Sequence, residues 1–249
     1  MTSTVVELPT RAPVVATRLL VTVRDPGTRQ YRSVGFLGHE NDRFSFAYLR
    51  RELARDGFRP LPGLARAVDG PLQSASLFPL FAERVISSRR PDRQLSLDAL
   101  GLPADAAPMQ VLARSQGQRV GDTIELLPAP AVGIGERVAF TFLTHGVRYL
   151  PESDQDRITT LVPGEPLRFR ADPANEVNPR AQLVTDFGDI QLGWLPDPLI
   201  DVVEAIDEQR LSVERANGPD VGFHFRLLAR LEGRVGERGL FIGSDWETA

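Results

Sequence analysis

The chain has 249 residues, of which 42% are hydrophobic and 25% charged, a composition typical of globular proteins. Its length is sufficient for two domains. The formal charge is −4, and all 29 basic residues are arginine. A net acidic chain does not suit a protein that coats duplex DNA through counterion release. The absence of lysine excludes a Walker A phosphate loop, a protein-kinase site and Schiff-base chemistry.

The first residues do not predict a targeting segment. Residues 1–16 lack a basic leader followed by an apolar core, because Glu7 and Pro9 interrupt the apolar residues. We therefore expect a flexible tail there. No apolar run approaches the roughly 18 residues of a membrane helix. The chain has no cysteine, which suits a cytoplasmic location.

Three strands are predicted at the start of a first unit, which we place at residues 17–130. Arg18–Val23 is a short apolar run, and Tyr31–Leu37 is its predicted hairpin partner. Arg43–Tyr48 alternates aromatic and other residues at period two, which is typical of a half-buried strand. The three runs predict an antiparallel sheet with the aromatic side chains in its core.

The rest of the first unit is predicted to be mainly helical. Leu77–Ser87 and Ala107–Ser115 are amphipathic helix candidates, and Val120–Leu127 closes the unit as a strand. This α+β unit also contains a local basic run, either a solvated face or a contact for an acidic partner or nucleic-acid phosphate. The run consists of Arg84, Arg89, Arg90 and Arg93.

Several short motifs of this unit are similar to the N-terminal domain of HipA-family kinases. They are Val34–Leu37, Phe44–Tyr48, Leu61–Gly63, Leu80–Arg84 and Gly121–Pro128. In that family the domain lies against a kinase core and does no chemistry itself. No kinase core follows here. The resemblance therefore implies an accessory subunit that docks a separately encoded HipA-type kinase, with the four arginines as candidate partner-binding residues.

A second unit is predicted at residues 136–235. Pro128-Ala129-Pro130 is the expected linker, stiffened by its prolines, and Gly133-Ile134-Gly135 is a turn. Short strands around one helix predict a small closed β-barrel of the OB or SH3-like kind. The predicted strands are Arg137–Thr144, Glu165–Ala171, Ala181–Thr185, Asp189–Leu195, Leu211–Ala216 and Val221–Leu231.

The one helix of this barrel is expected at Asp197–Arg210. Pro198 stands in its first turn, where a missing N–H costs little. An apolar stripe at helical spacing predicts its buried face, formed by Leu199, Val202, Val203 and Ile206. Residues 236–249 are expected to form a C-terminal tail, with Phe241, Ile242 and Trp246 able to dock.

Three separated motifs of the second unit resemble the HIRAN domain, a small β-barrel family that captures single-stranded DNA ends. They are Arg148-Tyr149, Asp172-Pro173-x-Asn175 and Gly193-Trp194-Leu195. The resemblance implies that the arginine and tyrosine contact DNA. It also implies that Asn175 orients the binding loop or contacts the strand, and that Asp172 pins the turn. Trp194 is either a stacking face or part of the barrel wall.

Two positions depart from the family pattern. Where the family often carries an aromatic residue followed by an aspartate, which close over the terminal nucleotide, this chain has Val177 and Asn178. Valine cannot stack on a base, and asparagine keeps its hydrogen bonds without the charge. Three interpretations remain: capture of a strand end, binding of nucleic acid without end preference, and a protein-docking barrel.

The chain carries no evident catalytic motif. His39, His145 and His224 are far apart without metal-ligand spacing, so we expect no enzyme, metal or cofactor. The favoured hypothesis is a non-enzymatic DNA-sensing accessory protein that binds single-stranded DNA at a 3′ end and belongs to a toxin–antitoxin or phage-defence module. The alternative is an antitoxin or protein-interaction subunit whose barrel does not bind DNA.

Overall fold

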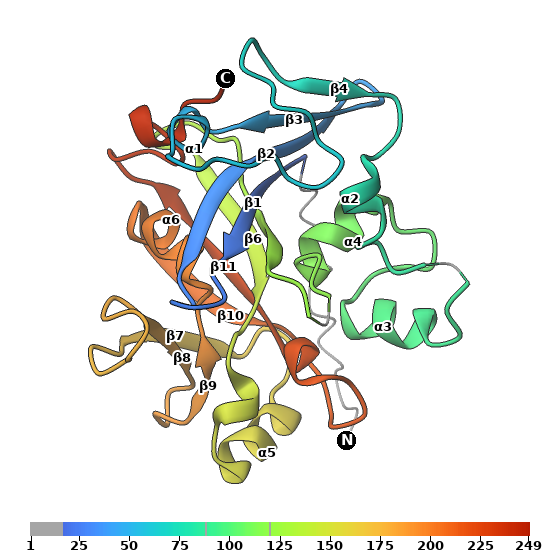
Figure 1. The fold of residues 1–249 in the computed structure, drawn as a ribbon. Helices are drawn as coiled ribbons and strands as arrows, with labels where there is room; N and C mark the ends of the chain where they lie inside the picture. Colours follow the sequence, from blue (N-terminus) through green and yellow to red (C-terminus); the bar gives the residue numbers. More distant parts are fainter. Residues whose placement is uncertain (1–16, 88, 120) are drawn as a thin grey trace.

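The computed structural model describes residues 17–87, 89–119 and 121–249, and its strands form two antiparallel sheets (Figure 1). The tail expected at residues 1–16 lies outside the described residues. The first sheet has the order β4-β3-β2-β1-β5. The predicted three-stranded sheet is its centre, and a short strand is added at each edge. Its strands are β1 (Arg18–Arg24), β2 (Tyr31–Glu40), β3 (Arg43–Tyr48), β4 (Leu72–Ser74) and β5 (Ile124–Pro128).

The aromatic residues of β3 fill the core beside this sheet, as their period-two spacing predicts. Phe46 and Tyr48 are fully buried, and their rings meet edge to face with centroids 4.8 Å apart. The hydroxyl of Tyr48 accepts the backbone N–H of Leu61 at 2.9 Å, which fixes the Leu61–Gly63 segment against the sheet. Gly35 on β2 permits this packing, because a Cβ there would lie 2.3 Å from the carbonyl oxygen of Ala47.

Four helices accompany the first sheet: α1 (Arg50–Leu53), α2 (Pro79–Ala82), α3 (Arg93–Ala99) and α4 (Pro108–Ser115). The helix predicted at Ala107–Ser115 is confirmed as α4. The helix predicted at Leu77–Ser87 is reduced to the single turn of α2. Backbone bonds from Arg84 to Phe81 and from Val85 to Ala82 have i to i−3 spacing and close that turn. Helices α2, α3 and α4 lie together on one side of the molecule (Figure 1).

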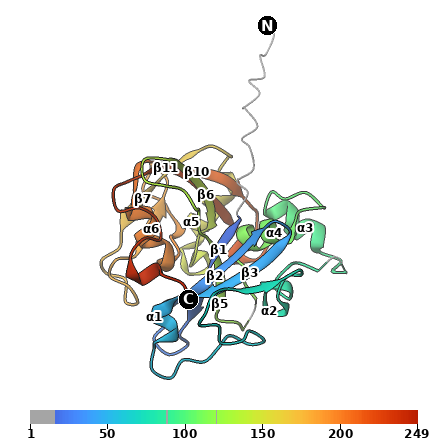
Figure 2. The same ribbon diagram turned by 90° about the horizontal axis from the view of Figure 1, so that it is seen from above.

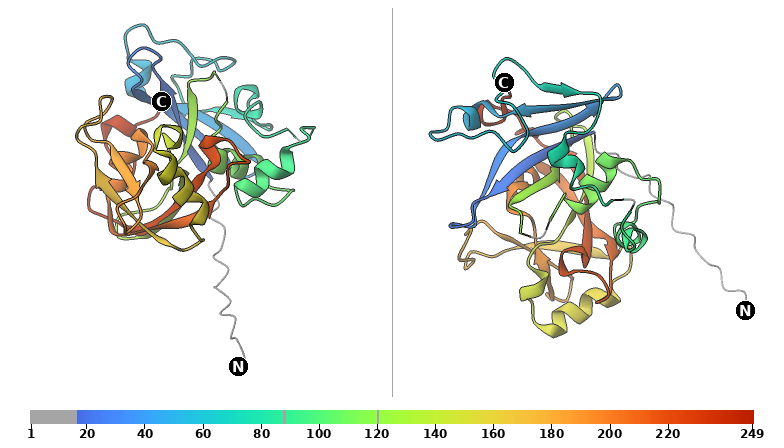
Figure 3. Two further views of the ribbon diagram at one scale, coloured as in Figure 1. Left: turned by 90° about the horizontal axis from the view of Figure 1, so that it is seen from below. Right: turned by 45° about the vertical axis from the view of Figure 1, so that its right-hand side comes forward.

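The second sheet has the order β6-β11-β10-β7-β8-β9 and is curled. A bridge between His145 and Trp194 returns β9 to the segment that follows β6. Helix α5 (Glu152–Thr160), which the sequence did not predict, lies at the end of the molecule away from β3 and β4 (Figures 1 and 3). The strands are β6 (Arg137–Leu143), β7 (Pro166–Ala171), β8 (Gln182–Thr185), β9 (Gln191–Trp194), β10 (Ile206–Ala216) and β11 (Leu227–Val235).

The helix predicted at Asp197–Arg210 is too long. A 3-10 turn, η2 (Asp197–Leu199), leads into the short helix α6 (Ile200–Glu204), and β10 begins at Ile206. The four apolar residues of the predicted stripe are all buried. Ile206, however, pairs with Val235 in the sheet, and an irregularity follows at Glu208, whose φ is 53°. The apolar stripe therefore spans a helix and the first residue of a strand.

The two sheets share one hydrophobic core. Leu20, Phe36 and Leu127 of the first sheet pack in the same cluster as Phe140 and Phe142 of β6. Seen from above, β1 and β2 lie beside β6 (Figure 2). The segment proposed as a linker takes part in this core: Ala129 is fully buried, and its N–H bonds the carbonyl of Arg18 at 3.1 Å.

The C-terminal residues pack back onto the first sheet. Phe241 contacts Phe36 edge to face at 5.5 Å, and Trp246, in the 3-10 turn η4 (Ser244–Trp246), lies 6.1 Å from the same ring. The N–H of Ala249 donates to the carbonyl of Tyr48 at 3.0 Å. The segment expected as a tail thus joins the two sheets. Within the described part of the chain, no helix has both the length and the apolar character needed to cross a membrane.

Candidate nucleic-acid interface

The arginine–tyrosine motif lies on the surface of the second unit. Arg148 and Tyr149 belong to a 3-10 turn, η1 (Val147–Tyr149), which begins at Gly146 with φ 73°. Tyr149 is 67% exposed, although large aromatic side chains are usually covered. The guanidinium of Arg148 lies 4.5 Å from the Tyr149 ring centroid and donates to its hydroxyl. The pair therefore presents a cation and an accessible ring together.

A second exposed ring lies next to this turn, and the sequence did not single it out. The 3-10 turn η3 (Phe223–Phe225) between β10 and β11 contacts η1. Phe223 is 45% exposed, with the guanidinium of Arg226 at 5.1 Å from its ring centroid. The strand predicted at Val221–Leu231 is wrong at its start, because Phe223–Phe225 form this turn and β11 begins at Leu227. Two accessible aromatic faces, each with an arginine, are thus adjacent.

The Asp172–Asn175 turn is held by its own side chains. Oδ2 of Asp172 accepts the indole N–H of Trp194 at 2.9 Å and the amide of Asn175 at 3.2 Å. Oδ1 of Asn175 accepts the backbone N–H groups of Val177 at 3.1 Å and Asn178 at 3.2 Å. Asp172 pins the turn, and Asn175 orients the loop from within it.

The two departures from the family pattern are also engaged within the protein. Val177 and Asn178 are both half-buried. Oδ1 of Asn178 accepts the backbone N–H of Arg180 at 2.9 Å, and the Asn178 side chain helps to lower the pKa of Asp197 on η2 against burial. Asn178 therefore holds its own loop and acts on the charge of η2.

Trp194 forms part of the wall of the curled sheet. Its backbone N–H donates to the carbonyl of His145 at 3.0 Å, and its carbonyl accepts the N–H of His145 at 2.8 Å. A Cβ on Gly146 would lie 2.5 Å from Cε3 of the indole, so the glycine makes room for the ring. Trp194 is half-buried and supports the turn that displays Arg148 and Tyr149.

A polar cluster joins this interface to the first sheet. Nε2 of His145 lies 2.8 Å from Oε1 of Glu125 on β5, and Glu125 also accepts the amide of Gln118 at 2.8 Å. The ring of Tyr31 at the start of β2 lies 6.1 Å from the His145 ring. The sequence does not reveal this cluster, because the partners of His145 come from other strands of the chain.

The charges of this cluster shift one another. Burial opposes ionisation of both His145 and Glu125, but their mutual attraction outweighs it. The pKa of His145 is consequently raised and that of Glu125 lowered. Burial, followed by the Glu125 charge, raises the pKa of Tyr31, and burial raises the pKa of Asp197. The attraction between His145 and Glu125 therefore favours the charged form of both groups.

The arginines proposed for partner binding are mostly engaged inside the chain. The side chain of Arg84 is 2% exposed, pairs with Asp122 and donates to the carbonyl of Leu80 at 2.6 Å. Arg93 donates to the carbonyl of Ile86. Only Arg89 and Arg90 are exposed, and Arg90 pairs with Asp92. Arg84 thus belongs to the interior, contrary to its proposed place on a docking surface.

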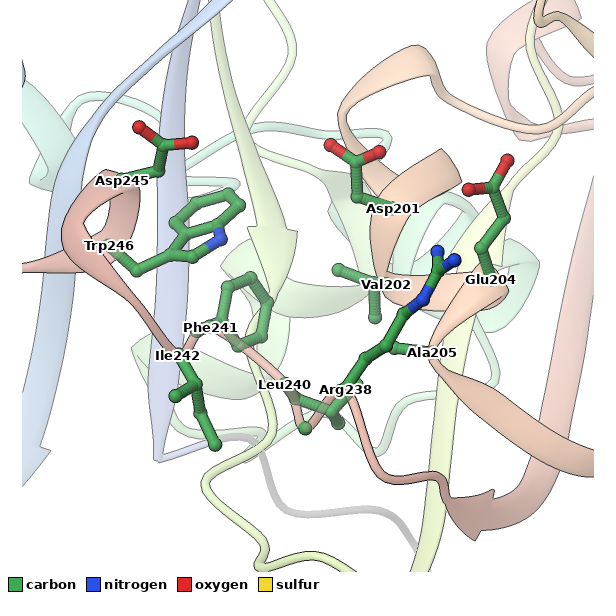
Figure 4. Close-up of a pocket in the computed structure, with 11 residues that line it drawn as sticks. Asp201, Val202, Glu204, Ala205, Arg238, Leu240, Phe241, Ile242, Asp245 and Trp246 are labelled. Atoms are coloured by element: carbon green, nitrogen blue, oxygen red, sulfur yellow. The ribbon is translucent and has the colours of Figure 1, made fainter.

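A cavity of about 260 Å³ lies between α6 and the C-terminal segment (Figure 4). Phe241 and Trp246 form one side of it, with ring centroids 5.0 Å apart at 90°. Asp201 and Glu204 lie on the opposite side (Figure 4). Among the described residues, no group of three or more acidic, histidine or cysteine side chains is placed to hold a metal ion.

Comparisons with known proteins give little beyond these observations. No family model and no curated protein matches the chain. A solved structure of a Lactobacillus plantarum protein from a structural genomics consortium is 21% identical, with 40% of this chain and 98% of that chain covered and a TM-score of 0.30. The HIRAN domain of human HLTF is 15% identical, with 43% and 81% covered and a TM-score of 0.28. At these values the similarity assigns neither a family nor a function.

Proposed function

We propose that the curled sheet of the second unit is a HIRAN-like domain that binds single-stranded DNA, and that the protein acts without catalysis. The observation that carries the proposal is the exposed Arg148–Tyr149 pair, which lies beside the exposed ring of Phe223. A single strand offers phosphates and unstacked bases. Arginines bind the former and aromatic rings stack on the latter.

The surroundings favour a strand over a duplex. Exposed rings cannot stack on bases that remain paired, and the chain carries a formal charge of −4. The hydrogen-bonding groups of Asp172 and Asn175 already serve the loop itself. They therefore contribute by holding the loop. Preference for a 3′ end depends on Asn178, whose side-chain oxygen accepts a backbone N–H of the same loop.

The test is fluorescence anisotropy with one short labelled strand at fixed salt, carrying a 3′-hydroxyl, a 3′-phosphate or a blocked 3′ end. We expect Arg148→Ala and Tyr149→Ala each to weaken binding by about tenfold, as loss of one stacked or charge-assisted contact predicts. Arg51→Ala is the matched control, because Arg51 also lies over a ring, at 5.2 Å from that of Trp246, on the C-terminal segment. Equal affinity in all three variants would remove the pair from the site.

A second candidate function is a protein-docking subunit, with a HipA-type kinase as the partner that the first unit's resemblance implies. The cavity beside α6 favours it. Ile242 and Ile134 are 59% and 57% exposed and lie close together next to Gly239, at the edge of this cavity. Exposed apolar side chains around a hollow are typical of binding surfaces.

Co-purification with a HipA-type kinase tests this second candidate. We expect Ile242→Asp to abolish the complex while leaving oligonucleotide binding unchanged. Val162→Asp is the control, since Val162 is 58% exposed and follows α5 at the other end of the molecule. A kinase complex without oligonucleotide binding would favour the alternative in which the barrel does not bind DNA.

A further inference from the structure

The cluster around His145 carries an inference that rests on the proposed function and extends it. We propose that His145 is a positioning residue for strand binding, and that it links the affinity for DNA to pH. It would do so by holding the Arg148–Tyr149 turn and the Asn178 loop against the first sheet.

The geometry places His145 between the binding surface and the first unit. Its backbone forms both hydrogen bonds of the bridge to Trp194, and it directly precedes Gly146, which begins the turn of Arg148 and Tyr149. Its side chain reaches in the other direction, to Glu125 on β5 at 2.8 Å. A change at the imidazole therefore acts on both the turn and the sheet.

The loop on the other side of the interface reaches the same histidine. The Asn178 side chain and the His145 charge both lower the pKa of Asp197 on η2 against burial, and the Asp197 charge in turn raises the pKa of His145. Asp197 thus couples the Asp172–Asn178 loop to His145, and through its contact to Glu125 on β5, by a chain of charged groups. Such a chain fixes the loop only while its members keep their charges and partners.

The groups that face His145 determine the sign of the effect. They are Glu125 from β5, Asp197 from η2, Tyr31 from β2 and the cation Arg24 at the end of β1. With the imidazole protonated, its charge balances Glu125. When the imidazole loses its proton, the carboxylates of Glu125 and Asp197 are no longer balanced by its charge, and this disfavours a polyanionic ligand. The hydrogen bond from His145 to Glu125 also becomes weaker, so the turn that carries Arg148 and Tyr149 is held less firmly.

The direction with pH follows. The Glu125 carboxylate raises the pKa of His145 against the opposing effect of burial, so the imidazolium persists above the ordinary titration range of histidine. DNA affinity should therefore fall as pH rises through that raised pKa. We expect a loss of about threefold to tenfold across the transition, the size of one charge acting through partly screened protein.

Anisotropy titrations from pH 6 to 9, at fixed salt with one labelled strand, test the proposal. The variants are His145→Gln, which keeps a donor for Glu125 but cannot titrate, and Asp197→Asn, which removes a carboxylate facing the imidazole. His39→Gln is the control, because His39 stacks on Phe44 at 4.3 Å on the first sheet. The NMR titration of the His145 ring in each protein gives its pKa independently of binding.

The expected result is a pH-dependent affinity in the wild type and in His39→Gln, which His145→Gln lacks. In Asp197→Asn the midpoint should move to lower pH together with the NMR pKa of His145, so this variant decides the matter if His145→Gln does not fold. An equal pH slope in wild type and His145→Gln, or an unmoved midpoint in Asp197→Asn, would overturn the inference but leave the DNA-binding proposal intact. No binding at any pH would refute the proposed function and the inference with it.

Discussion

Phe36→Ala should destabilise both sheets together, because the ring of Phe36 belongs to the first sheet but packs in the core of the second. The ring is 6% exposed and contacts Phe241 and Trp246. Removing a buried phenylalanine ring typically costs about 3–5 kcal/mol through lost transfer energy and the remaining cavity. With a urea m-value of roughly 3 kcal/mol per molar, the unfolding midpoint should fall by about 1–1.7 M.

The assay is urea unfolding followed by two probes. The chain has two tryptophans, Trp194 and Trp246. In a Trp246→Phe background, the fluorescence of Trp194 reports the second sheet alone, and far-ultraviolet circular dichroism reports the whole chain. Both transitions should shift by the same amount in Phe36→Ala.

The comparison variant is Phe46→Ala, whose ring is fully buried within the core cluster of the first sheet. It should also shift both probes if the sheets unfold as one unit. If the Trp194 transition stays in place in Phe36→Ala while circular dichroism shows an earlier partial loss, the two units are thermodynamically separate. The shared core would then not couple them.

Three further predictions concern individual contacts. Arg84→Ala should destabilise the protein by about 2 kcal/mol in chemical denaturation, because it removes a buried side chain that pairs with Asp122 and bonds the carbonyl of Leu80; a loss under 0.5 kcal/mol would contradict this. Gly193→Ala should lower the melting temperature and weaken strand binding, because at φ 122° its Cβ would lie 2.7 Å from the carbonyl oxygen of His145; an unchanged melting curve would refute the close approach. Burial opposes the Asp186 charge, but Arg157 and two backbone N–H groups lower its pKa, so the stability it contributes is present above its unfolded pKa and lost on acidification. Asp186→Asn should accordingly flatten the dependence of stability on pH below about 5, and an equally steep acid transition in this variant would refute the role.

The strands could be predicted from the sequence because their signal is local. Arg43–Tyr48 was predicted with its observed bounds, since alternation at period two reports a face and needs no knowledge of the partner strand. The predicted helix at Asp197–Arg210 is too long because this signal is only local. The apolar spacing shows which residues are buried, but Ile206 is buried equally well as the first residue of a strand as it would be in a helix.

The polar cluster could not be predicted in this way. Glu125 on β5 and His145, in the segment after β6, lie 20 residues apart in the sequence. In the sequence, each of the two looks like an ordinary residue at the edge or end of a strand. Tyr31 is separated from both by more than 90 residues and so gives no local signal either. Their proximity arises from the packing of β5 against the segment after β6, which no periodicity encodes. The prediction that Arg84 lies on a docking surface is wrong for a related reason. Sequence spacing shows that Arg84 is near other arginines, but it does not show that Arg84 is buried and paired with Asp122.

The residues of the three HIRAN-like motifs separate into two groups once their contacts are known. Asp172, Asn175 and Trp194 bond to one another or to the loop, so folding alone is a sufficient reason for their identities. Tyr149 and Phe223 differ, because an accessible aromatic ring adds nothing to the core and leaves apolar surface in water. The proposed binding of DNA gives these two rings a role that folding does not. Substituting the first group should therefore cost stability and affinity together, whereas substituting the second should cost affinity alone.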